Sequence, residues 1–125
     1  MPVPILKQGD CLIASVQSAL SDAEMLALRD DLARQVRQHR ARGVVVDVTA
    51  LDVIDSFAAL TLRTIAEIMR LSGAQTVIVG IHPDAAFAMV QLGLTLDGVP
   101  TALDLDAGLA FLARPRLGAG RRDAP

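Results

Sequence analysis

Aromatic side chains are nearly absent from this sequence, which has three Phe and neither Tyr nor Trp. Proteins that bind single-stranded nucleic acids stack the bases on aromatic faces, and this chain offers almost none. The formal net charge is -2, so the basic surplus that attracts duplex nucleic acid is missing as well. These two absences argue against a nucleic acid as a partner.

Cysteine occurs once, at Cys11, so an intramolecular disulfide bond is impossible and a cysteine-based zinc site lacks ligands. The two histidines, His39 and His82, are far apart in the sequence and form no paired zinc motif. We therefore expect no metal and no other cofactor. Cys11 itself is expected to pack inside a strand as a small apolar side chain.

Long apolar runs are missing, although hydrophobic residues make up 52% of the 125 residues. The longest stretches without Asp, Glu, Lys or Arg are residues 71–83 and 85–96, each shorter than the roughly 18 residues that span a membrane. The first ten residues lack the basic start and apolar run of a signal peptide. We expect a cytoplasmic protein without a membrane partner, in which some apolar faces are buried against other molecules.

Apolar runs with the period of strands alternate with runs that have the period of helices. Strands are expected at residues 3–7, 11–16, 44–48, 76–81 and 101–103, and helices are expected between and after them, four in number. The first two strands are joined closely enough for a hairpin. The alternation predicts a single α/β domain with a mixed, mostly parallel sheet of about five strands and about four helices.

The composition changes at Arg114, where Gly, Pro and Arg replace the apolar periodicity. We expect residues 1–113 to form the domain and residues 114–125 to be a flexible tail.

Helix ends are predicted from local chemistry. Ser21 and Glu24 have the spacing of a capping box at the first helix, which Gly43 is expected to stop. His82 precedes a proline and is expected to cap the third helix, and Asp104 is expected to cap the last one. The second helix is expected to bury one broad apolar stripe: Phe57, Leu60, Ile65, Ile68 and Met69.

Three carboxylates and two hydroxyls lie between the third strand and the second helix. They are Asp47, Thr49, Asp52, Asp55 and Ser56. In mostly parallel sheets, the carboxyl ends of strands and the helix starts that follow them form the usual functional surface. This segment is therefore the candidate site.

One interpretation of the segment is enzymatic: Asp47, Asp52 and Asp55 bind Mg²⁺ in a metal- or nucleotide-dependent enzyme, and one of them accepts a phosphoryl group. That chemistry needs a nearby cation to neutralise the developing charge, and the only lysine, Lys7, belongs to the first strand. A second interpretation is structural, with Asp55 or Ser56 acting only as the cap of the helix.

A third interpretation is a covalent switch at Ser56. Phosphorylation there adds about -1.5 to -2 charges at a helix start. The helix dipole tolerates the phosphate, whereas Asp52 and Asp55 repel it, and so does a partner packed on this surface. The domain would keep its fold while the partner is rejected.

The segment at residues 55–59 (DSFAA), preceded by residues 44–51 (VVVDVTAL), resembles the signature of STAS domains, the sulfate-transporter and anti-sigma-factor-antagonist family. Other stretches are similar, more particularly, to the small single-domain scaffold protein of the bacterial stressosome (RsbS type): residues 4–7, 80–83, 92–94 and 101–105. The resemblance covers about residues 2–113.

The resemblance implies a protein that works by binding and is not an enzyme. Ser56 matches the serine that a switch-type serine/threonine kinase phosphorylates. Thr49 lies in the loop where related stressosome proteins can carry a second site, on threonine. Asp52, Asp55 and Phe57 are the candidate partner contacts, although packing in the core at the helix start is the first expectation for Phe57.

The implied partners are that kinase and the STAS domains of larger sensor paralogues, with which this domain forms a homo- or hetero-oligomer. The scaffold sequesters the kinase until phosphorylation releases it. Antagonists that act directly on an anti-sigma kinase often have Ser or Thr and then Gly after the phosphorylated serine, whereas Phe57 and Ala58 stand here. A direct anti-sigma-factor antagonist and the Mg²⁺ enzyme are the alternatives.

Overall fold

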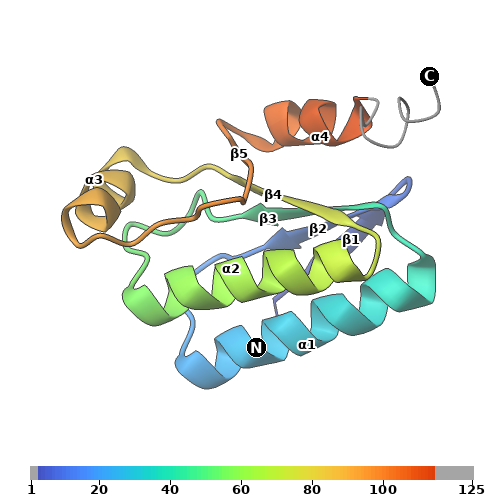
Figure 1. The fold of residues 1–125 in the computed structure, drawn as a ribbon, viewed down its shortest axis with the longest axis horizontal. Helices are drawn as coiled ribbons and strands as arrows, with labels where there is room; N and C mark the ends of the chain where they lie inside the picture. Colours follow the sequence, from blue (N-terminus) through green and yellow to red (C-terminus); the bar gives the residue numbers. More distant parts are fainter. Residues whose placement is uncertain (1–2, 115–125) are drawn as a thin grey trace.

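The computed structural model describes residues 3–114 of the chain (Figure 1). In this range the strands are β1 (Ile5–Gln8), β2 (Cys11–Ser15), β3 (Gly43–Asp47), β4 (Gln75–Val79) and β5 (Thr101–Ala102). The helices are α1 (Asp22–His39), α2 (Ser56–Leu71), α3 (Pro83–Gln91) and α4 (Leu105–Ala113). The predicted α/β class is confirmed, as are the numbers of strands and helices. Of the tail expected at residues 114–125, all but Arg114 lies outside the described residues.

The sheet is mixed and mostly parallel, as the alternation of elements predicts. Its strands lie in the order β1-β2-β3-β4-β5, with β1 antiparallel to β2 and every other neighbouring pair parallel. Gly9 and Asp10 form the turn of the β1–β2 hairpin, and Gly9 supplies the positive φ of 62° that this turn needs. Pro4 precedes β1, an edge strand, where its missing N–H is tolerated.

Helices enclose the sheet from both sides. α1 and α2 cover one face, α4 covers the other, and α3 lies at one end (Figure 1). Because side chains alternate along a strand, β3 sends Val44 and Val46 to the α1–α2 side and Val45 to the α4 side. All three are completely buried, so the continuous apolar run of this strand reflects burial on both faces.

The start of α1 matches the sequence prediction, but its end does not. Ser21 Oγ accepts a hydrogen bond from the Glu24 amide at 3.1 Å, and the Glu24 carboxylate accepts one from the Ser21 amide at 2.8 Å. The helix ends at His39 because Arg40 adopts the left-handed conformation, with φ at 51°. The prediction that Gly43 stops the helix is wrong. Gly43 begins β3, where a Cβ atom would lie only 2.9 Å from a methyl carbon of Leu112.

α2 buries one face against the sheet, and the expected stripe is wrong at one position. Leu62, Ile65 and Met69 are buried, whereas Leu60 is 55% exposed. At about 100° per residue, Leu60 points away from Ile65 and lies on the side of the helix that carries Ser56. Apolar residues surround so much of this helix that the sequence alone allows more than one choice of buried face.

The last strand is short, and the reason is a proline. β5 pairs only with Ile78 and Val79 at the end of β4. Pro100 precedes β5 and has no N–H, so the ladder cannot extend toward the start of β4. The Pro100 carbonyl still accepts a hydrogen bond from the Ile78 amide at 3.0 Å.

The starts of the last two helices are as predicted. His82 caps α3 by accepting a hydrogen bond from the Asp84 amide at 3.3 Å. Asp104 caps α4 by accepting one from the Ala107 amide at 2.9 Å. None of the helices in residues 3–114 has the length and apolar character needed to cross a membrane.

Candidate functional site

The candidate site lies where β3 ends and α2 begins. Ser56 is the first residue of α2, and its side chain is exposed. Asp55, directly before it, caps the helix, because its carboxylate accepts a hydrogen bond from the Ala58 amide at 2.8 Å. The cap fixes the path of the chain into the helix and holds Ser56 at the positively polarised helix end. The prediction that Asp55 or Ser56 caps the helix is confirmed for Asp55.

The hydroxyl of Ser56 is accessible, and no hydrogen bond to another part of residues 3–114 engages it. Two exposed apolar side chains lie near it in the chain: Val53, which is 68% exposed, and Leu60, which is 55% exposed. Exposed apolar side chains next to polar ones are typical of protein interaction sites. Neither side chain was predicted to be exposed, although the four-residue spacing of Ser56 and Leu60 places them on one helix face.

Thr49 is also exposed, but its hydroxyl is engaged. It donates a hydrogen bond to the Asp47 carboxylate at 2.6 Å, and the same carboxylate accepts one from the Thr49 amide at 2.9 Å. Gly80 comes so close that a Cβ atom there would collide with Thr49 Oγ1 and lie 3.0 Å from Thr49 Cα. Phosphorylation of Thr49 therefore requires its hydroxyl to leave Asp47 first, a step that Ser56 does not need.

The three carboxylates of the segment do not converge. In the part of the chain that the structure describes, no group of three or more His, Cys, Asp or Glu side chains is placed to hold a metal ion. Asp47 and Asp55 instead accept hydrogen bonds from backbone amides, and Asp52 is exposed. This arrangement counts against the Mg²⁺ enzyme, because that interpretation requires Asp47, Asp52 and Asp55 to share one cation.

Phe57 is half-buried and packs against the main core cluster under α2. Its contact with the core agrees with the packing role expected first for this residue. Asp52 and Asp55 are exposed on the surface around Ser56. The assignment of Asp52, Asp55 and Phe57 as partner contacts stays a prediction.

α3 lies at the same end of the molecule as the first turn of α2 (Figure 1). It is held there by the buried side chains of Ala85 and Met89. Its other side carries Phe87 and Val90, which are 66% and 78% exposed, and Leu92 follows at 72%. The end of the molecule that carries Ser56 thus presents apolar side chains from two helices.

Cys11 lies at the opposite end of the sheet, at the start of β2, and is half-buried. Burial raises the pKa of its thiol above the usual value, and the neighbouring Asp10 carboxylate raises it further. A thiol that stays protonated is a poor nucleophile. Cys11 lies in a strand as expected, but it is half-buried, and its sulfur lies 3.7 Å from a carboxylate oxygen of Asp10.

Comparison with known proteins matches residues 3–107 to the STAS domain family. The RsbT co-antagonist protein RsbRA of Bacillus subtilis is 33% identical over 82 residues, which make up 66% of this chain and 30% of RsbRA. The chain thus spans less than a third of the length of this curated relative.

Solved structures with similar sequences match over nearly the whole domain. An RsbS variant of Moorella thermoacetica with a serine-to-glutamate substitution is 33% identical, with a TM-score of 0.76, over 88% of this chain and 93% of that chain. A chain in a structure of the stressosome, described as a signal integration and transduction hub, is 31% identical, with a TM-score of 0.71, over 87% of this chain and 95% of that chain.

The family match includes every strand of the sheet and the junction of β3 and α2 that carries Ser56. The relatives above 30% identity include RsbRA, RsbS and a chain of the stressosome. The chain belongs to the STAS-domain family.

Proposed function

We propose that this STAS domain is a non-enzymatic scaffold in a partner-switching module of a bacterial stressosome. It holds a switch-type serine/threonine kinase until Ser56 is phosphorylated, and it assembles with the STAS domains of larger sensor paralogues. The similarity to RsbR- and RsbS-type proteins supports the scaffold role. The observation that carries the switch is the exposed, unengaged hydroxyl of Ser56 at a capped helix start. The cytoplasmic location stays a prediction.

A phosphate on Ser56 changes the surface while the helix persists. It adds about -1.5 to -2 charges at the end of α2 where the helix dipole favours a negative group. The exposed Asp52 and Asp55 carboxylates repel the phosphate once a partner excludes water. A partner that covers Val53 and Leu60 must also desolvate the new charge, which is unfavourable. The partner is therefore released from a folded domain.

The size of the effect sets a requirement on the interface. To convert a mostly bound population into a mostly free one, phosphorylation must lower the affinity by about 10⁴-fold. A charge at the rim of an interface changes affinity only modestly, whereas a charge buried at its centre costs much more. Ser56 must therefore lie within the contact area of the partner.

The direct anti-sigma-factor antagonist uses the same serine and differs only in its partner. RsbRA, RsbS and a chain of the stressosome are among the relatives above 30% identity, which favours a sensor paralogue and a switch kinase over an anti-sigma kinase. Phe57 and Ala58 after the serine point the same way.

The test measures the affinity of the full chain for its cognate sensor paralogue and kinase by titration calorimetry. Ser56→Ala is expected to bind as tightly as the wild type. Ser56→Asp is expected to weaken the complex about tenfold or more, because a buried like charge at an interface costs several kcal/mol. Thr64→Asp is the matched control, since Thr64 is exposed about two turns further along α2 and receives the same charge.

Undiminished binding by Ser56→Asp would contradict the proposal. An equal loss in Thr64→Asp would show a general charge effect and would remove Ser56 from its special role. Capture of an anti-sigma kinase, with no binding to sensor paralogues, would replace the scaffold by the direct antagonist.

A further inference from the structure

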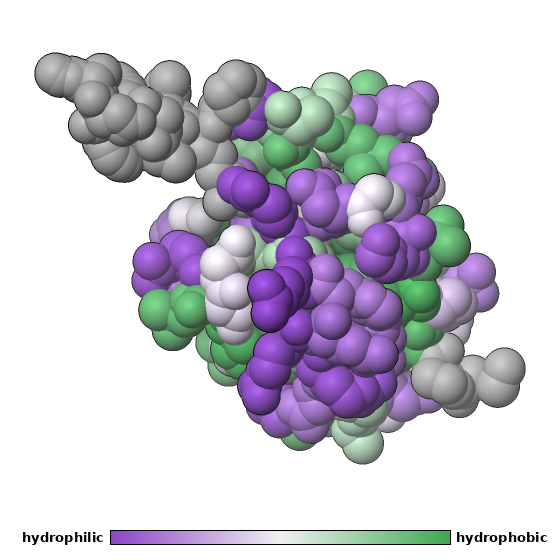
Figure 2. Space-filling view, turned by 90° about the vertical axis from the view of Figure 1, so that its right-hand side faces the viewer, coloured by the Kyte–Doolittle hydropathy of each residue, from purple (hydrophilic) through white to green (hydrophobic). Residues whose placement is uncertain are grey.

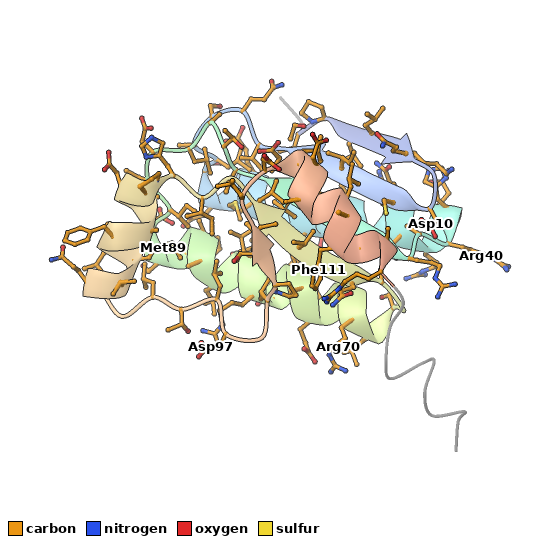
Figure 3. The ribbon with its side chains drawn as sticks, turned by 90° about the horizontal axis from the view of Figure 1, so that it is seen from above. Asp10, Arg40, Arg70, Met89, Asp97 and Phe111 are labelled. Carbon is orange, nitrogen blue, oxygen red and sulfur yellow. The ribbon has the colours of Figure 1, made fainter. Side chains whose placement is uncertain are left out.

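A cavity of about 470 Å³ opens at the end of the sheet opposite Ser56. The end of α2, the start of β4, the segment before β5 and the end of α4 form its walls, with side chains or backbone of Arg70, Thr76, Gly98, Pro100, Phe111 and Arg114. Figure 3 shows Arg70 and Phe111 reaching this region from two helices, far from Met89 of α3. The volume lies in the range of small-molecule sites, about 300–1,000 Å³.

A buried polar group without a partner lies in the wall of this cavity. Thr76 is 3% exposed, and its hydroxyl oxygen has no hydrogen bond within residues 3–114. An unpaired buried hydroxyl costs about 1–3 kcal/mol, so native structures rarely keep one without a reason. The oxygen itself is not accessible from the cavity, so Thr76 belongs to the cavity wall but its hydroxyl is not counted among the ligand contacts.

The backbone of Thr76 also faces the open edge of the sheet. The amides of Ile78 and Gly80 bond to Pro100 and Ala102, on the β5 side, and those backbone groups alternate in direction along the strand. The amide and carbonyl of Thr76 therefore point toward the same edge of the sheet. Thr76 lies before the part of β4 that pairs with β5, so β5 does not cover these groups. Pro100 cannot donate to that carbonyl, because it has no N–H.

The cavity is lined by two cations, and none of its lining residues is acidic. Arg70 bonds through Nη2 to Glu67 at 2.5 Å and through Nε at 3.2 Å, which leaves the other donors of the guanidinium free. The guanidinium carbon of Arg114 lies 3.9 Å from the centre of the Phe111 ring. Stacking on the ring leaves the N–H groups at the edge of this guanidinium available to a ligand.

The wider surface around the opening is polar. Figure 2 faces the end of the molecule where α1 and α2 terminate, and hydrophilic side chains cover most of it. The cavity differs from this surface, because Ala66, Pro100 and Phe111 add apolar walls to its two arginines. A cavity of this kind suits a ligand that has an anionic group at one end and an apolar part at the other.

We propose that this cavity binds a small organic anion, a carboxylate or a phosphate monoester, between the guanidinium groups of Arg70 and Arg114. The apolar body of the ligand lies against Phe111 and Pro100. The site does not depend on the proposed function, because β4 runs parallel to β3 and the start of β4 lies away from Ser56.

The experiment titrates the isotope-labelled full chain with benzoate, phenyl phosphate and benzamide and follows the backbone amide signals by NMR. Benzoate and phenyl phosphate share a ring and differ in the anionic group, so they distinguish carboxylate from phosphate recognition. Benzamide is the neutral analogue. We expect saturable shifts at Thr76, Gly98 and Arg70 with at least one anion, and a much weaker response to benzamide.

Variants separate binding from folding. Arg70→Gln and Arg114→Gln are each expected to weaken anion binding about tenfold, because hydrogen bonds to charged groups are the strong ones. Arg40→Gln is the matched control, an exposed arginine outside the cavity lining. Thr76→Val removes the unpaired hydroxyl while keeping the shape, so the unfolding midpoint in urea is expected to stay equal or rise.

Three results would overturn the proposal. The first is the absence of saturable shifts with both anions, and the second is equal affinity for benzamide. The third is a loss of affinity in Arg40→Gln as large as that in Arg70→Gln.

Discussion

Asp55 has two separable tasks at the residue scale, since it caps α2 and it also places a negative charge beside Ser56. Its carboxylate accepts the hydrogen bond from the Ala58 amide, which is a structural task that needs only an oxygen acceptor. Its charge matters only when a phosphate or a partner arrives. An asparagine keeps the acceptor and removes the charge.

Asp55→Ala is therefore expected to lower the free energy of unfolding by about 1 kcal/mol, because the cap of α2 is lost. Asp55→Asn is expected to stay within about 0.5 kcal/mol of the wild type, since the two residues are equally good caps. Asp52→Ala serves as the control, because Asp52 is exposed and caps nothing. Urea unfolding measures all three, and equal stability of Asp55→Ala and Asp52→Ala would refute the capping role.

Gly80 is a second residue on which the local structure of the site depends. Its φ is +79°, and its missing Cβ leaves room for Thr49. Gly93 has a similar φ of +71° but would place a Cβ in open space. An alanine at Gly93 therefore introduces backbone strain alone. An alanine at Gly80 introduces the same strain and also a clash with the loop that follows β3.

Gly93→Ala is expected to cost about 1–2 kcal/mol, which is the price of a left-handed alanine. Gly80→Ala is expected to cost about 1–3 kcal/mol more, because the new methyl group collides with Thr49. Chemical denaturation checks the difference. Equal costs at the two positions would mean that the Thr49 loop moves aside freely and that its close packing against Gly80 does not contribute to stability.

At the scale of elements, α2 has a face for the core and a face for partners. Leu62→Ala is expected to lower the free energy of unfolding by about 2–5 kcal/mol, because Leu62 is 3% exposed. Leu60→Ala is expected to change it by less than about 0.5 kcal/mol, because Leu60 is 55% exposed, and to weaken partner binding instead. Thermal unfolding and titration with the sensor paralogue check the two effects. A large stability loss in Leu60→Ala would contradict the two-face description.

Element starts were predictable because their chemistry is local. Ser21 and Asp104 each accept a hydrogen bond from an amide three residues ahead, so a short window of sequence is enough. The buried strand β3 was predictable for the same reason, from a run of β-branched residues.

Contacts between distant segments were not predictable. Gly108 lets α4 approach the sheet so closely that a Cβ atom there would lie 2.5 Å from a methyl carbon of Val79. The sequence around Gly108 does not indicate this contact. The prediction for Gly43 was wrong because Gly43 packs against Leu112, which is distant in the sequence. The prediction for Leu60 was wrong because it depends on which face of α2 is buried against the sheet. The separate hydrogen bonds of Asp47 and Asp55 likewise depend on the path of the loop, which the spacing of acids does not reveal.

At the scale of the whole molecule, the exposed apolar side chains of α2 and α3 predict association. Sedimentation velocity of the full chain, alone and with the sensor paralogue, is expected to show complexes that Leu60→Ser and Phe87→Ser weaken. Leu71→Ser is the control, since Leu71 is 72% exposed at the other end of α2. A strict monomer under both conditions, or an equal effect of Leu71→Ser, would contradict the scaffold role.

Phosphosite mapping by mass spectrometry tests the switch most directly, after the full chain has been incubated with its cognate switch kinase and ATP. We expect one phosphate on Ser56 in the wild type and in Thr49→Ala, and little incorporation in Ser56→Ala. Equal incorporation in Ser56→Ala, or a wild-type chain modified elsewhere with Ser56 bare, would contradict it.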